Sequence, residues 1–438
     1  MYNHPYVVEP VPGEPFDFRV VQADDFGSFW NRGEAQQTLD HVQARAQTTN
    51  TLVVLFIHGW HNNADPANAN LRGFRAALGK MHGLLDTPER RALRERTTGQ
   101  ADFALVGIYV GWRGRSLPGW LDYATFWGRK NAAERTGEGD VSEFIQRLQH
   151  LYLRTNEFDV RRHGPSKPFL GLVAIGHSFG AQVLWKSIAS RLEEPLIAQA
   201  HVLSDALDPT DRSQRDREGL PIDGLGDLNV LLNPATEAYQ YARVDALYRQ
   251  LQYPSAQTPQ LVVFSADNDR ARRFYFPIGR ALGSPFRPSF RDRHDGYQGQ
   301  LWGHALGELD EQQTHTLRRP APGTTPADSL TDADYSNAQR IRAFDFTDRL
   351  VLGGLVLEPS RPVAASAGRV PYSPVLSVKS LDGIIDGHNG IFLDDFNRFL
   401  LNFVAYIEAK RLMLRRERLL TGSHAQPLVQ AADALRAD

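Results

Sequence analysis

The sequence predicts an α/β fold in which helices flank a mostly parallel β-sheet. Short apolar runs without polar alternation recur along the chain, a pattern typical of strands that are buried on both faces of a parallel sheet. Between these runs, apolar residues at spacings of three and four predict helices. Strands and helices therefore alternate, and a chain of 438 residues is long enough to bury a large core around them.

Six apolar runs are expected to form the strands of the sheet. They are residues 51–57, 104–110, 169–175, 228–232, 260–264 and, more weakly, 374–378. The helices are expected at 33–48, 71–81, 138–153, 181–198, 235–252 and, at the C-terminal end, 391–419. Basic residues in the last turns of that final helix complement the negative end of its dipole, which explains them without a binding patch.

This alternation predicts one α/β domain over residues 51–410. Residues 1–50 are mixed and polar and are expected to form an N-terminal extension, whereas 411–438 hold the end of the last helix and a tail. Two stretches interrupt the pattern: 112–137 is aromatic and amphipathic, and 270–373 is long and rich in Pro, Gly and Arg. Connections of that length in a compact domain are typically lids or caps, so both insertions are lid candidates.

Composition excludes several classes of site and partner. Without any cysteine, the chain forms no disulfide, no thiolate nucleophile and no cysteine-based metal site. A net charge of −2 predicts neither a nucleic-acid nor a membrane partner held by bulk electrostatics. The first residues lack the pattern of a Sec signal peptide, and no apolar run approaches the ~20 residues of a membrane span. We therefore expect a cytoplasmic protein without stable membrane insertion, and leave export without a signal peptide open.

A Gly-x-Ser-x-Gly segment, Gly176-His177-Ser178-Phe179-Gly180, carries the strongest chemical signal. The five letters alone are a weak motif, but an expected buried strand comes directly before them and an expected helix directly after. That strand–turn–helix context holds a serine in a strained turn and exposes its hydroxyl at the edge of the sheet. Ser178 is therefore the candidate nucleophile.

The first expected sheet strand ends in His58-Gly59-Trp60. The backbone amides of Trp60 and Phe179 are candidate donors for an oxyanion. Gly59, with His58 and His177, is assigned to candidate substrate contacts, although hydrogen bonds to the loop backbone are an alternative role for His58. A metal site on His58 and His61 has no suitably spaced carboxylate, so neither a metal nor another cofactor is expected.

A serine nucleophile needs a histidine that accepts its proton and a carboxylate that orients the histidine. In chains with such a turn the order is Ser, acid, His. Asp267 and Asp269 both follow the expected strand 260–264 and are both candidates, with Asp208 a third. Each of the three is otherwise explained as a turn or capping residue.

The candidate base is His388, which lies between glycines on a late loop, after the last expected strand and before the last helix. The flanking glycines suit a loop that brings an imidazole over the serine. His294 and His304 also follow the candidate acids, but they lie inside the long insertion.

With these segments identified, the sequence resembles the α/β-hydrolase superfamily, and within it bacterial esterase- and lipase-like serine hydrolases. The segments that carry the resemblance are HGWHNNA at 58–64, GHSFGA at 176–181 and NPA at 233–235. The run NDRA at 268–271, with Phe-Pro at 276–277, is similar to the acid-bearing loop of such proteins. The resemblance covers about 51–280 and 374–410. It implies an α/β-hydrolase fold with lid or cap insertions and a Ser–His–Asp triad, and it favours Asp269 over Asp267 as the acid.

The expected function is hydrolysis of a small-molecule or lipid carboxylic ester through an acyl-enzyme on Ser178. Aromatic lid candidates favour an apolar acyl group, with core packing as their alternative explanation; they are Trp120, Tyr123, Phe126, Trp127 and a cluster between 274 and 302. The same triad also serves thioesterases, amidases and acyltransferases. Two further alternatives are a non-catalytic binding scaffold and a lipase exported as an effector.

Overall fold

The structure is a computed structural model of the chain. It describes residues 5–112, 126–158, 168–206, 221–269, 300–301, 303–321, 330–343, 346–360 and 371–421. Several residues singled out above lie outside this described part: Asp208, His294, Trp120, Tyr123 and the aromatic cluster between 274 and 302. Phe126 and Trp127 are described only as backbone within a helix.

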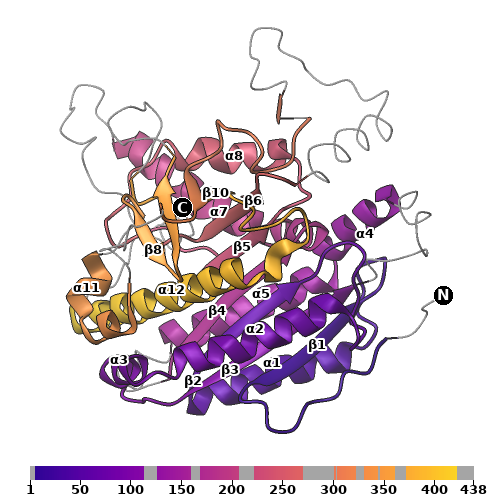
Figure 1. The fold of residues 1–438 in the computed structure, drawn as a ribbon, viewed down its shortest axis with the longest axis horizontal. Helices are drawn as coiled ribbons and strands as arrows, with labels where there is room; N and C mark the ends of the chain where they lie inside the picture. Colours follow the sequence, from indigo (N-terminus) through magenta and orange to yellow (C-terminus); the bar gives the residue numbers. More distant parts are fainter. Residues whose placement is uncertain are drawn as a thin grey trace, which may run out of the picture.

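Ten strands of the described chain form one sheet (Figure 1). Their order across the sheet is β1-β3-β2-β4-β5-β6-β10-β7-β9-β8. The strands are β1 (Asp17–Ala23), β2 (Asn50–Ile57), β3 (Phe103–Trp112), β4 (Leu170–His177), β5 (Leu228–Leu232), β6 (Leu261–Ala266), β7 (His315–Arg318), β8 (Leu350–Leu352), β9 (Leu355–Pro359) and β10 (Val375–Ser380). In this spatial order, every pair of neighbouring strands from β1 across to β7 is parallel. The last two pairs, β7–β9 and β9–β8, are antiparallel. The expected α/β class with a mostly parallel sheet is thus confirmed.

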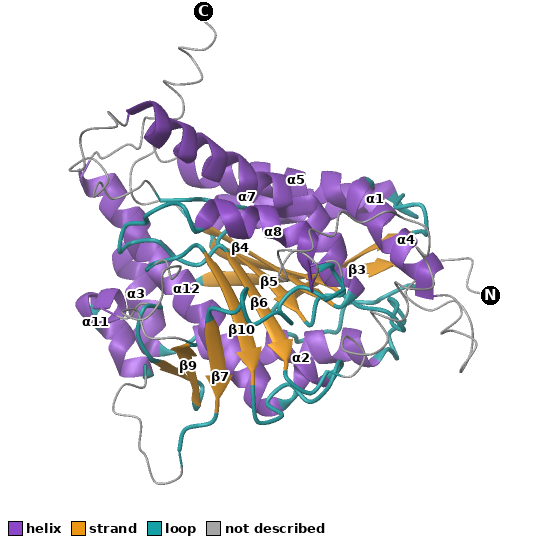
Figure 2. Cartoon of the chain, turned by 90° about the horizontal axis from the view of Figure 1, so that it is seen from above, coloured by secondary structure: helices purple, strands orange, loops and turns teal. Residues whose placement is uncertain are grey.

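Helices cover both faces of the sheet (Figure 2). One face carries α2 (Ala69–Leu85), α3 (Pro88–Thr98), α11 (Ala338–Ala343) and α12 (Asp394–Thr421). The other carries α1 (Arg32–Thr48), α4 (Phe126–Glu138), α5 (Asp140–Leu153), α7 (Phe179–Ala206) and α8 (Ala238–Tyr248). Two short 3-10 helices, Asp332–Ser336 and Gly390–Phe392, and a π-helical turn, Arg154–Phe158, complete the described elements.

The sheet separates two apolar cores by the alternation of its side chains. Along β2, Val54 and Phe56 pack into the core under α2 and α12, whereas Val53, Leu55 and Ile57 pack against the helices of the opposite face. Successive residues of a strand point to opposite faces. A continuous apolar run is therefore what a strand between two helical layers requires, and this is why these strands were predictable.

The strands at the two edges of the sheet were not predicted from the sequence. At one edge β1 pairs with β3, so the expected extension 1–50 contributes a strand and α1 to the sheet and its helical layer. At the other edge β7, β9 and β8 come from the expected lid insertion 270–373 and extend the sheet beyond β10. Within the described residues, no helix has both the length and the apolarity needed to cross a lipid bilayer.

Candidate active site

The order of the strands places a topological switch point between β2 and β4. β2 pairs with β3 on one side and with β4 on the other, so the chain reverses its direction of travel across the sheet between these strands. Open α/β sheets bind their ligands at the carboxyl ends of the strands at such a reversal. Ile57, the last residue of β2, is in register with Gly176 of β4. The loops that begin at His58 and Ser178 therefore lie side by side.

Ser178 occupies a strained turn between β4 and α7. Its φ of +56° lies in the left-handed region, which is uncommon for any residue other than glycine. The turn is stabilised because the Ser178 amide donates to the carbonyl of Leu232 at 2.9 Å, and the Ser178 carbonyl accepts from the amides of Ala181 and Ala235, both at 3.1 Å. Ser178 is only 3% exposed. The residue whose hydroxyl the sequence identified as the candidate nucleophile thus has a strained backbone that three hydrogen bonds hold in place.

Two glycines allow the backbone segments of the site to touch. A Cβ on Gly180 would overlap the carbonyl oxygen of Ile57 and would lie 2.5 Å from that of His58. A Cβ on Gly59 would lie 2.7 Å from the Cβ of Ser178. Real side chains do not approach backbone this closely, so only glycine lets the first turn of α7 and the loop after β2 close around Ser178.

This close approach predicts opposite effects for two Gly→Ala substitutions. Gly180→Ala is expected to destabilise the fold by about 3 kcal/mol, because the added methyl forces the start of α7 away from β2. Gly83→Ala is the matched control, since Gly83 is exposed on α2 and its added methyl meets nothing within 4 Å. That control is expected to stabilise by about 0.5 kcal/mol through reduced backbone entropy. Urea unfolding measures both; equal effects would contradict the steric account.

The side chains of Ser178, His388 and Asp269 form one hydrogen-bonded chain. The Ser178 hydroxyl lies 2.7 Å from Nε2 of His388, and Nδ1 of the same ring lies 2.7 Å from Oδ2 of Asp269. A carboxylate only accepts, so the Nδ1–H of the ring donates to Asp269 and Nε2 accepts from the serine. Asp269 is 1% exposed, whereas the side chain of His388 remains 21% exposed and open to an incoming molecule.

The two other candidates that the structure describes, Asp267 and His304, do not join this chain. The Asp267 amide donates to the carbonyl of Ser380, and no hydrogen bond between the Asp267 carboxylate and His388 exists in the described part of the chain. His304 bonds through Nδ1 to the carbonyl of Gln300, and its own carbonyl accepts from Ala238 at the start of α8. Among the candidates that the structure describes, the geometry therefore favours Asp269 over Asp267 and His388 over His304.

Two buried side chains hold the loop of His388 by its backbone. Nε2–H of His177 donates to the His388 carbonyl at 2.9 Å, and Nδ2 of Asn233 donates to the same carbonyl at 3.0 Å and to that of Gly387 at 3.1 Å. Oδ1 of Asn233 accepts from the Ala266 amide at 2.8 Å, which ties the loop to the end of β6. Asn233 belongs to the NPA segment, to which the sequence analysis gave no role.

His177 was assigned to substrate contacts, and in the structure its ring bonds to the backbone of the loop that carries His388. The ring is 1% exposed and its Nε2 is committed to the His388 backbone. Burial, followed by the repulsion of a charged His388, lowers the pKa of His177 to about 3. The ring is therefore neutral at physiological pH, and it holds the loop of His388 in place.

His58 was also assigned to substrate contacts, and in the structure both nitrogens of its ring bond to backbone. Its Nδ1–H donates to the carbonyl of Gly59 at 2.8 Å, and its Nε2 accepts from the amide of Trp112 at 3.0 Å. The ring is fully buried, stacked 5.6 Å from the indole of Trp112. Burial lowers the pKa of His58 to about 4. This is the backbone-bonding alternative that the sequence left open.

The two neutral histidines predict a loss of stability in acid. The unfolded chain binds a proton at each ring near pH 6.5, whereas folded His58 does so only near pH 4, so the unfolded state gains protons first as the pH falls. Stability attributable to neutral His58 is complete above pH 6.5 and declines by about 3 kcal/mol on acidification to pH 4. His177 acts in the same direction. Urea unfolding measured from pH 7.5 to pH 4.5 checks this.

A comparison of two histidine variants isolates the contribution of His58. His58→Gln is expected to be less stable at neutral pH but to lose less stability on acidification, because it has no ring to protonate. His150→Gln, which changes an exposed histidine of α5, is expected to retain the pH dependence of the original chain. An unchanged pH dependence in His58→Gln would contradict the buried neutral ring.

The candidate oxyanion donors lie on the two backbone segments that meet at Ser178. Phe179 is the first residue of α7, and amides in the first turn of a helix point outward and favour a negative charge. The Trp60 ring lies 6.2 Å from the Phe179 ring, so the loop after β2 is packed against the start of α7. Negative charge that develops beside the Ser178 hydroxyl is therefore favoured at this end of α7.

Comparisons with protein-family models, with curated proteins and with solved structures each found no match. The chemical interpretation of the site therefore depends on its own geometry. That geometry consists of a serine hydroxyl at a strained strand-to-helix turn, an imidazole within hydrogen-bond reach and a buried carboxylate behind the imidazole.

Proposed function

We propose that the protein is a serine hydrolase of the α/β-hydrolase type that cleaves carboxylic esters of small molecules or lipids. The observation that carries this proposal is the pair of 2.7 Å contacts that link Ser178 to His388 and His388 to Asp269. These are the distances at which a base removes a proton and a carboxylate orients the base.

The proposed reaction proceeds through an acyl-enzyme. His388 removes the hydroxyl proton as Ser178 Oγ attacks the ester carbonyl, and Asp269 stabilises the imidazolium that forms. The amides of Trp60 and Phe179 donate to the oxyanion of the tetrahedral intermediate. His388 then donates its proton to the departing alcohol, which leaves an acyl group on Ser178. Water, deprotonated by His388, attacks this acyl group, and collapse of the second intermediate releases the acid and restores the serine.

The order of the elements along the chain supports the α/β-hydrolase assignment. Ser178 follows β4, Asp269 follows β6 and His388 follows β10, so nucleophile, acid and base appear in the order that this fold uses. All three strands are parallel, with β5 between β4 and β6, and their carboxyl ends therefore lie at one edge of the sheet. The positive φ of Ser178 also supports the assignment, because the nucleophile of an α/β-hydrolase occupies a strained strand-to-helix turn.

Other uses of the same triad are distinguished by their leaving groups and acceptors. Thioesterases, amidases and acyltransferases share the acyl-enzyme and differ in what leaves and what attacks it. A non-catalytic scaffold predicts no acyl-enzyme at all. An exported lipase is the same ester hydrolase with a membrane lipid as its substrate.

The test is a panel of matched substrates and one active-site probe. p-Nitrophenyl esters of increasing chain length, with thioester and anilide counterparts, are assayed with the full-length protein, which is also treated with a fluorophosphonate. We expect probe labelling and the highest kcat/KM on esters. Labelling with turnover confined to thioesters or anilides would reassign the reaction, and a folded protein without labelling would support the scaffold.

A further inference from the structure

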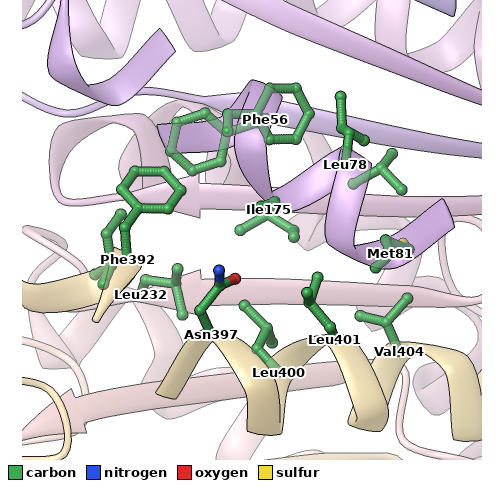
Figure 3. Close-up of a pocket in the computed structure, with 14 residues that line it drawn as sticks. Phe56, Leu78, Met81, Ile175, Leu232, Phe392, Asn397, Leu400, Leu401 and Val404 are labelled. Atoms are coloured by element: carbon green, nitrogen blue, oxygen red, sulfur yellow. The ribbon is translucent and has the colours of Figure 1, made fainter. Parts of the chain in front are cut away.

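The loop that carries His388 lies between two apolar anchors. Ile385, before the loop, and Ile391, after it, are both buried in the core under α2 and α12. Phe392 extends the second anchor, because its ring forms part of the wall of an apolar pocket between the sheet and these helices (Figure 3). Residues 386–390, between the anchors, are exposed or half-buried, so apolar packing alone does not fix the base.

Asn268 joins this loop to the loop that carries Asp269. Its Nδ2–H donates to Oδ1 of Asp386 at 2.9 Å, and its Oδ1 accepts from the amide of Gly387 at 2.8 Å. Asn268 directly precedes Asp269, and Gly387 directly precedes His388. Two hydrogen bonds therefore connect the two loops one residue away from the 2.7 Å contact between Asp269 and His388.

The chemistry of this link requires an amide side chain at residue 268. A carboxylate only accepts and a backbone N–H only donates, so the side chain between them has to supply one donor and one acceptor. An asparagine that forms an ordinary turn bonds to backbone a few residues away. Asn268 instead bonds to residues 118 and 119 positions later in the chain. Turn formation therefore does not account for these bonds.

Gly387 makes the link important for the base that follows it. Its φ of +61° lies in the region that favours glycine, and a Cβ there would meet nothing within 4 Å, so steric contact does not restrain it on that side. Its amide is held by Asn268 at 2.8 Å, and its carbonyl is held by Asn233 at 3.1 Å. Side-chain amides thus fix both backbone groups of the residue before His388.

We propose that Asn268 is a positioning residue, which holds Asp269 and His388 at hydrogen-bond distance by joining the two loops that carry them. The inference rests on the proposed function for its rate measurements. Asn268 is itself exposed, so the stability of the fold depends little on its two bonds. A small displacement between an acid and a base, in contrast, slows a reaction considerably.

Steady-state hydrolysis of a p-nitrophenyl ester by the full-length Asn268→Ala variant tests the effect on rate. We expect kcat to fall about tenfold with KM nearly unchanged, because the acid and base lose their alignment but no group that touches the substrate is removed. Asn337→Ala is the matched control: Asn337 is also exposed, directly precedes α11, and accepts through Oδ1 from the amides of Gln339 and Arg340. This control is expected to retain kcat.

An exchange of the two side chains tests the link itself. Asn268→Asp alone is expected to lower kcat at least as much as Asn268→Ala, because two carboxylates then face each other. Combined with Asp386→Asn, the same change is expected to restore kcat to within about threefold, since the donor and the acceptor have exchanged places and both bonds form again. An asparagine that serves only the fold predicts no such recovery.

Proton NMR separates this inference from the proposed reaction. Nδ1–H of His388 donates to a buried carboxylate and is expected to give a far-downfield signal, which the His388→Gln variant assigns by its loss. We expect Asn268→Ala to shift or broaden this signal and Asn337→Ala to leave it unchanged.

Four results would overturn the inference: an unchanged signal in Asn268→Ala, an unchanged kcat in a protein that does hydrolyse esters, an effect on KM alone, or no recovery in the exchanged pair. If the signal responds as expected but the original chain hydrolyses no ester, the positioning role stands and the proposed reaction fails.

Discussion

Replacing Ser178 by glycine is expected to abolish ester hydrolysis, lowering kcat by a factor of about 10⁶, while making the protein more stable than the Ser178→Ala variant. Both substitutions remove the hydroxyl that contacts His388. Only glycine also relieves the backbone, because φ at residue 178 is +56° and a Cβ is unfavourable in that region. The difference in unfolding free energy between the two variants is expected to be about 1 kcal/mol in favour of glycine.

This pair of variants separates the chemistry from the strain. Stopped-flow or steady-state hydrolysis of a p-nitrophenyl ester measures the loss of activity. Urea unfolding measures the free energy of unfolding, which reports the backbone strain at residue 178. Equal loss of activity with different stability shows that the strain belongs to the turn and not to the hydroxyl. Activity retained in either variant, or a glycine variant less stable than the alanine variant, would contradict the assignment of Ser178 as a strained nucleophile.

Asp269→Asn is expected to lower kcat by about 10⁴, with little change in KM. Its carboxylate accepts from Nδ1–H of His388 at 2.7 Å, and an amide in its place stabilises the wrong tautomer and no longer stabilises the imidazolium. Asp267→Asn is the matched control, since it makes the same chemical change two residues earlier in the same loop. That control is expected to remain within about twofold of the original chain.

The comparison of these two aspartates also tests the choice between the sequence candidates. Circular dichroism and urea unfolding show that both variants are folded, so that the rates are comparable. If Asp267→Asn lost activity and Asp269→Asn retained it, the acid of the site would have to be reassigned. Similar losses in both would mean that the loop, and not one carboxylate, is what the reaction requires.

The central sheet was predictable because a strand that is buried on both faces has a continuous run of apolar residues. Six continuous apolar runs became β2, β3, β4, β5, β6 and β10, all parallel and adjacent. The edge strands gave no such signal. β1 has the sequence DFRVVQA, with its first four residues only partly buried, and β8 is three residues long. Short or half-exposed strands gain their stability from the neighbour they pair with, which a single sequence does not reveal.

Sequence reasoning found the residues of the candidate site but not the side chains that hold them. Ser178 and His388 were located by their places in the strand order. Only the family resemblance favoured Asp269 over Asp267, and the geometry adds the contact between Asp269 and His388. Asn233 and His177 act through the backbone of His388, 155 and 211 residues away along the chain. A hydrogen bond between a side chain and a distant backbone carbonyl produces no recognisable residue spacing in the sequence. The NPA segment was therefore the only sequence signal that included Asn233.

The central claim is that the hydroxyl of Ser178 is the activated nucleophile, and peptide mapping of the fluorophosphonate-treated protein tests it most directly. Mass spectrometry of the digested, full-length protein is expected to find the phosphonate on the peptide that contains Ser178, and prior heat denaturation is expected to prevent the reaction. A phosphonate on a different serine, or an unmodified peptide from protein shown to be folded, would contradict the account.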